Sequence, residues 1–130
     1  LVGNTAKKQP EKPLIYREAG SATRTAMEKY FSDRKGNLRK KMELTSKEAV
    51  KQAVIAGLGY SIVPLIGIHN ELENNQLYIL PSKGLPIVTQ WRLIWLKNKR
   101  VSPVAQAYLD FIRNEKHRIL NEHFQWCRFY

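Results

Sequence analysis

Hydrophobic and polar positions along the chain follow two alternating periods. Short apolar runs, bounded by Gly, Pro or polar loops, lie at 14–16, 38–44, 60–63, 76–80 and 87–96. Such runs are typical of strands. Between them, apolar residues recur every three or four positions, which is typical of helices. This alternation predicts an α/β fold, with a mostly parallel sheet flanked by helices in three layers.

The helix predicted after residue 44 has the clearest ends. Thr45 and Glu48 have the spacing of a capping box, with Thr45 as the N-cap. Val50 and Val54 belong to an apolar stripe that faces a core. Gly57 follows as the expected C-terminal stop.

Three further elements complete the predicted core. A helix opens at Ser21, its N-cap, and ends within 33–36. The run 87–96 is rich in β-branched and aromatic residues, so it is predicted to be a buried strand. A last helix starts with Ser102 as cap and Pro103 at its first position. Its apolar stripe consists of Val104, Tyr108, Ile112 and Ile119.

Composition narrows the class of protein. The 130 residues suit one domain, 43% of them are hydrophobic, and no run of about 18 apolar residues could span a membrane. Net charge is +11, from 22 Lys+Arg against 11 Asp+Glu. The longest basic block is 39–41, so the excess charge is scattered. We therefore expect solvated surface charge rather than a DNA-binding face.

No residue pattern indicates an enzyme. Cys127 is the single cysteine, which fits a reducing cytoplasm and excludes an intrachain disulfide. His69, His117 and His123 lack metal-ligand spacing, and no phosphate loop or catalytic serine or zinc motif occurs. We expect no catalysis, no metal and no cofactor.

Two predicted strand-to-helix junctions are rich in hydroxyl groups. Ligands of α/β folds bind where helices begin, and a helix N-terminus attracts carboxylate or phosphate. Arg24 could pair with an anion or with Glu28 one turn further on. The simpler interpretation, that these Ser and Thr residues are caps alone, stays open. The candidate ligand-binding residues are Gly20, Ser21, Thr23, Thr45 and Ser46.

Five ordered segments resemble the effector-binding domain of LysR-type transcription regulators. They lie at 14–24, 42–51, 53–64, 84–87 and 99–105, and the resemblance covers about 12–113. It implies half of a type 2 periplasmic-binding-protein-like domain: the second subdomain, with a strand and a helix that return to the first. It also implies that the loops Gly20–Thr23 and Thr45–Ser46 meet at a cleft between the subdomains.

The function that the resemblance implies is the sensing of a small anionic metabolite, for which a carboxylate is expected. The winged helix-turn-helix and most of the first subdomain are not in this sequence, so DNA contact would come from a domain outside it. The alternative is a fragment of a periplasmic solute-binding protein of an anion transporter. A third interpretation, a basic nucleic-acid-binding domain, predicts steeply salt-dependent DNA affinity.

The C-terminal residues match no motif of that family. We divide the chain into 1–113, the effector-binding subdomain with its return strand and helix, and 114–130, a helical extension. The stretch 124–130 holds four aromatic residues, which are expected to pack onto the domain or a partner subunit. Packing onto a partner subunit would make the protein a homo-oligomer, which we expect. The single cysteine favours a cytoplasmic location.

Overall fold

Within the residues that the structure describes, four short strands form two ladders, one parallel and one antiparallel. The computed structural model describes residues 1–7, 9, 11–32 and 41–130. The strands are β1 (Val2–Gly3), β2 (Leu14–Arg17), β3 (Lys41–Leu44) and β4 (Tyr78–Ile79). β2 and β3 are parallel, whereas β1 and β4 are antiparallel. Of these two strand pairs, the expectation of a mostly parallel sheet therefore holds for β2 and β3.

The segment Tyr60–Ser61 joins the two ladders. The Ile15 N–H donates to the Tyr60 carbonyl at 2.8 Å, and the Val2 N–H donates to the Ser61 carbonyl at 2.8 Å. The bridge from Tyr60 to β2 is parallel and that from Ser61 to β1 is antiparallel. The predicted strand at 60–63 is thus reduced to these two residues, which connect a mixed set of strands.

Helices are present at the three places predicted, after residues 21, 44 and 102. The described helices are α1 (Ala22–Ser32), α2 (Lys47–Ile55), α3 (His69–Glu73) and α4 (Pro103–His123), with 3₁₀ turns η1 (Leu65–Gly67) and η2 (Gln125–Phe129). Gly57 ends α2 with φ +77°, and the Gly57 and Leu58 N–H groups donate to the Val54 and Ala53 carbonyls. This bonding is a Schellman motif, which confirms the predicted stop. The predicted end of α1 at 33–36 lies outside the described residues.

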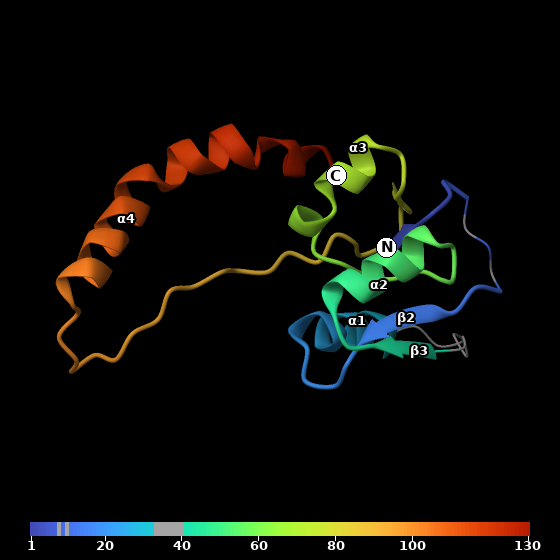
Figure 1. Cartoon of the computed structure of the whole chain (residues 1–130), viewed down its shortest axis with the longest axis horizontal. Coiled ribbons are helices and arrows are strands. Elements are labelled where there is room, and N and C mark those ends of the chain that lie inside the picture. The colour runs from blue at the N-terminus through green and yellow to red at the C-terminus, as the bar shows by residue number, and fades with distance from the viewer. Residues whose placement is uncertain (8, 10, 33–40) are drawn as a thin grey trace. The chain divides into compact units, whose positions relative to one another are not determined.

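The core around β2 divides between its two faces. Ile15 is fully buried in a cluster with Val50 and Val54 of α2. Its neighbour Tyr16 is buried in a second cluster with Met27 of α1. Because successive strand residues point to opposite faces, α1 and α2 cover opposite faces of β2 (Figure 1). Met42 and Leu44 of β3 both pack against the first cluster.

The chain divides into two compact units, Leu1–Ile87 and Val88–Tyr130. In the second unit, residues 88–96 form no strand, and Trp91 and Ile94 are 85% and 90% exposed. The prediction of a buried strand at 87–96 is therefore wrong for this chain. Its apolar side chains and backbone groups have no strand beside them among the described residues.

Helix α4 begins as predicted. The Ser102 hydroxyl accepts from the Ala105 N–H at 3.3 Å, and Pro103 is the first helical residue. The helix continues through 113 and 114 without a break. No residue of α4 is buried, so its predicted apolar stripe faces no core within the described residues. None of the described helices is long and apolar enough to cross a bilayer.

Candidate functional site

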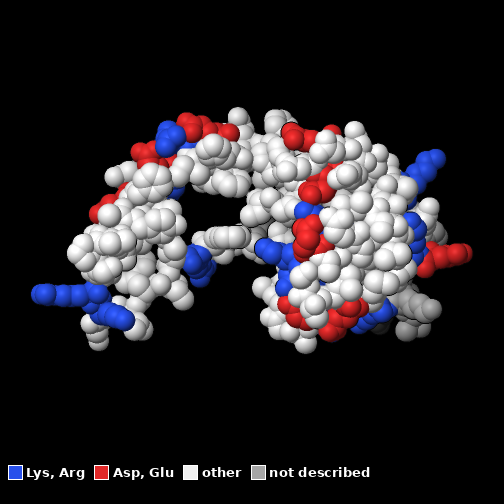
Figure 2. Space-filling view, viewed as in Figure 1, with Lys and Arg blue, Asp and Glu red and all other residues white. Residues whose placement is uncertain are grey.

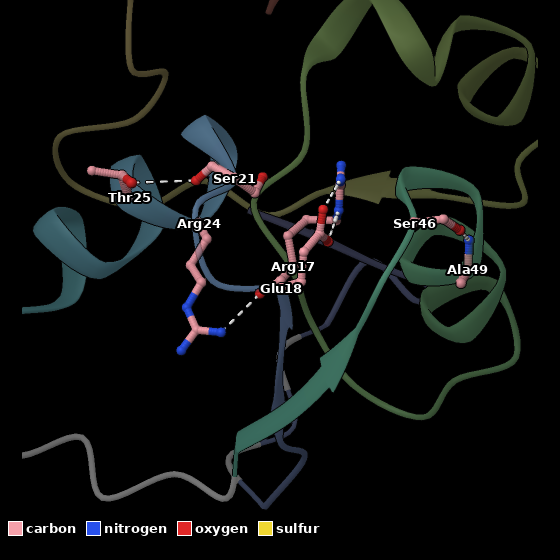
Figure 3. A network of polar contacts seen from close by, with 7 residues as sticks. All are labelled: Arg17, Glu18, Ser21, Arg24, Thr25, Ser46 and Ala49. Atoms are coloured by element: carbon pink, nitrogen blue, oxygen red, sulfur yellow. Dashed lines mark hydrogen bonds and ion pairs between the residues drawn. The ribbon is translucent and has the colours of Figure 1, made fainter.

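The two hydroxyl-rich turns lie at the same edge of the sheet. Arg17 ends β2 and is aligned with Leu44, which ends the parallel strand β3. The turn before α1 and the turn before α2 therefore leave neighbouring strands at one edge (Figure 3). Gly20 has φ +86° in the first turn, a conformation that L side chains rarely adopt. The two turns therefore lie at the same end of the β2–β3 pair.

Polar groups at this edge remain available to a ligand. The hydroxyls of Ser21, Thr23 and Thr45 have no hydrogen-bond partner among the described residues, and none of the three residues is buried. The same holds for the first backbone N–H groups of α1, at 22–24, and for those of Lys47 and Glu48 in α2. Such N–H groups, at the positive end of a helix dipole, favour an anion.

The N-cap of α2 is one residue later than predicted. Ser46, not Thr45, accepts from the Ala49 N–H, at 2.9 Å. Glu48 accordingly bonds Gln52 and Lys51 instead of closing a capping box. The pattern does not distinguish adjacent Thr and Ser, because either hydroxyl has the chemistry of a cap. Ser46 therefore has a structural role whether or not a ligand binds.

Replacing Ser46 by alanine is expected to lower the free energy of unfolding by about 1 kcal/mol, because the Ala49 N–H loses its acceptor. Urea denaturation measures this change. Thr45→Ala is the matched control and should have an effect below about 0.5 kcal/mol. A larger loss from Thr45→Ala than from Ser46→Ala would contradict the cap assignment.

Arg24 connects α1 to both strands. Its Nε donates to Glu28 at 2.8 Å, and its Nη1 donates to the Arg17 carbonyl at 3.1 Å and to the Glu43 carboxylate. These bonds raise the pKa of Arg24, with Glu28 as the largest cause. Of the two predicted alternatives for Arg24, the structure shows the pairing with Glu28. Arg24 holds the start of α1 against β2 and β3.

An ion pair between Arg17 and Glu18 was not predicted from the sequence. The Arg17 Nε and Nη2 donate to the two Glu18 carboxylate oxygens at 2.7 and 2.6 Å. In the view of Figure 3 the pair lies between Ser21 and Ser46. The hydrogen bonds from Arg17 are the largest cause of the lowered pKa of the Glu18 carboxyl. An arginine at the last position of a buried strand, directly before the hydroxyl-rich turn, was the available signal.

Other chemistry finds no support in the described part of the chain. There, no group of three or more His, Cys, Asp or Glu residues is arranged to hold a metal ion. Desolvation raises the pKa of the Cys127 thiol, the opposite of what a nucleophile needs. On the face in Figure 2, Lys and Arg side chains lie in several separate places, many of them near Asp and Glu, which agrees with the prediction of scattered charge.

Comparison with known proteins identifies the family. A family described as "LysR substrate binding domain" matches residues 7–116. The RuBisCO operon transcriptional regulator of Allochromatium vinosum is 45% identical over 109 residues, which are 84% of this chain and 36% of that protein. The transcriptional activator CmpR of Synechocystis sp. is 44% identical over 100 residues, 77% of this chain and 33% of CmpR. The chain thus spans about a third of the length of these relatives.

A solved structure agrees with the same family. The regulatory domain of CcmR from Synechocystis, in complex with 2-PG, matches with a TM-score of 0.72 and 33% identity. The match covers 80% of this chain and 50% of the CcmR chain. The regulatory domain of a HypT mutant from Salmonella typhimurium has a TM-score of 0.64 at 18% identity, over 84% of this chain and 54% of that chain, which shows a shared fold.

These matches favour a regulator over the alternative of a transporter's binding protein, and over an enzyme. The segments that carried the sequence resemblance, from 14–24 to 99–105, all lie within the matched range. The α/β fold agrees with that of the solved regulatory domains. The chain belongs to the substrate-binding, or effector-binding, domain family of LysR-type transcription regulators.

Proposed function

We propose that this chain is the ligand-sensing part of a bacterial transcription regulator, and that it binds a small anionic metabolite at the edge where α1 and α2 begin. The observation that carries the proposal is the parallel register of β2 and β3, which brings both hydroxyl-rich turns to one edge. The anion would accept hydrogen bonds from Ser21, Thr23, Thr45 and Ser46 and from helix N-terminal amides. Gly20 leaves the backbone open to it.

The chemistry of the effector follows from the donors present. Hydroxyl and amide donors, with Arg17 beside them, suit oxygen-rich anions such as carboxylates and phosphates. CcmR, a relative at 33% identity, was solved with 2-PG, 2-phosphoglycolate, which carries both groups. We propose an effector of this class. Binding would shift the balance between two arrangements of the regulator, which requires unequal affinity for them.

The remaining parts of the chain fit a longer regulator. We propose that residues 1–113 form the second half of a type 2 periplasmic-binding-protein-like domain, with 88–96 and α4 returning to the first half. Residues 114–130 would form an extension, and exposed apolar side chains of α4 would support homo-oligomer formation. DNA contact would come from a helix-turn-helix domain of the longer protein. We propose that this regulator acts in the cytoplasm. The exposed side chains are Val104, Tyr108, Phe111 and Leu120.

Replacing Thr23 by valine in the natural full-length protein is expected to weaken binding of 2-phosphoglycolate about tenfold, because one hydrogen bond to a charged ligand is lost. Titration calorimetry measures the change in dissociation constant. Thr25→Val is the matched control on the same helix, since the Thr25 hydroxyl already donates to the Ser21 carbonyl. Equal affinities for wild type and Thr23→Val would show that the site assignment is wrong.

A further inference from the structure

We infer that Arg17 is the cation that receives the anionic group of the effector, and that Glu18 is a built-in competitor for the same guanidinium. On binding, the anion would exchange with the Glu18 carboxylate, which would turn toward water. The inference rests on the proposed function, because it names the residue that pairs with the effector at that same edge. It adds a specificity-determining pair to the hydroxyl-rich turns.

The first observation is the position of Arg17. It is two residues after Ile15, so its side chain lies on the α2 face of β2. Arg17 is also aligned with Leu44, and Leu44 is two residues before Ser46, the N-cap of α2. The guanidinium is thereby placed at the edge where α2 begins.

The second observation is the way in which Glu18 holds Arg17. Two parallel hydrogen bonds of 2.7 and 2.6 Å join the guanidinium to both carboxylate oxygens. This is the geometry with which arginine recognises a free carboxylate or phosphate. Adjacent strand residues point to opposite faces, so the pair can form because β2 ends at Arg17 and Glu18 enters the turn. Glu18 accepts from Arg17 the same two hydrogen bonds that a small carboxylic acid would accept.

The third observation is that the two partners are unequally held. The Arg17 side chain is 16% exposed and that of Glu18 is 33% exposed. A guanidinium has five N–H donors, of which Glu18 takes two, and the other three have no acceptor among the described residues. Glu18 lies just before Ala19 and Gly20, which are both exposed. The carboxylate has a short path into water, whereas the guanidinium stays at the edge.

The fourth observation concerns the other paired cations nearby. Arg24 contacts two carboxylates, Glu28 and Glu43. Lys51 also contacts two, Glu48 and Glu71. Arg17 has one, Glu18. An anion therefore needs to displace one carboxylate to pair with Arg17, whereas it would need to displace two to take the place of both partners of Arg24 or Lys51.

The test measures the affinity of the natural full-length protein for 2-phosphoglycolate and for inorganic phosphate by titration calorimetry. Glu18→Gln removes the competing charge and is expected to tighten binding of 2-phosphoglycolate about tenfold. Arg17→Gln is expected to weaken it at least about tenfold. Glu28→Gln is the matched control, because it also removes one carboxylate from an arginine pair, and its effect should stay within about twofold.

The outcomes separate the inference from the proposed function. A wild-type protein that binds neither anion overturns both. If wild type binds but Glu18→Gln does not bind more tightly, the inference fails while the proposed function stands. An equal gain from Glu28→Gln also overturns it, because general charge would then explain the effect. Glu18→Gln keeps the test decisive if Arg17→Gln is poorly folded, since loss of fold cannot increase affinity.

Discussion

Replacing Ile15 by alanine is expected to lower the free energy of unfolding by about 4 kcal/mol. Ile15 is fully buried at the centre of β2, and its side chain packs against Val50 and Val54 of α2. Its loss would remove buried apolar surface and leave a cavity between the strand and the helix. Because β2 also positions the candidate site, molecules that the substitution unfolds should not bind the effector.

Urea denaturation of the wild-type and variant chains measures this change. Ile66→Ala is the matched control, since it deletes the same atoms from a side chain that is 49% exposed in η1. Its expected cost is below about 1 kcal/mol, as for most surface substitutions. Similar losses from the two variants would contradict the assignment of Ile15 to the core.

The sequence predicted helix ends well where the determinant is local. Ser102 and Pro103 start α4 because a hydroxyl can accept from an N–H three residues later and Pro needs no N–H partner there. Gly57 ends α2 because it adopts a positive φ. The error at Thr45 has the opposite origin, since two adjacent hydroxyl residues offer two equivalent caps.

The sequence was less informative where the determinant is a distant partner. The apolar run 87–96 indicated surface that requires burial, but periodicity does not say which element provides it. Similarly, the antiparallel pairing of β1 with β4 places Val2 opposite Ile79, near the other end of the same unit of the chain. Such pairings depend on the whole topology and leave no local pattern.

The candidate site shows both situations. Its hydroxyl groups were predictable because Ser and Thr at helix starts are a local signal. Their proximity was implied by the family resemblance alone, because no local pattern shows that Arg17 is aligned with Leu44 across β2 and β3. The Arg17–Glu18 ion pair was not predicted from the sequence, because it depends on β2 ending at Arg17.

Replacing Ile94 by lysine should have opposite consequences in two contexts. In this chain, Ile94 is 90% exposed, so the unfolding midpoint should shift by less than about 2 °C and self-association should weaken. In the full-length regulator that we propose, the first half of the domain would bury 88–96. The lysine would then be buried without a partner charge, and the loss of stability should reach about 3 kcal/mol or more.

Thermal unfolding and sedimentation of both proteins test this prediction. Asn98→Lys is the matched control, because it places the same charge at a polar, exposed position in the turn that follows the segment. It should be tolerated in both contexts. Equal tolerance of Ile94→Lys in the full-length protein would show that 88–96 stays in water there. The segment would then not be a return strand, and its apolar side chains would need a different partner.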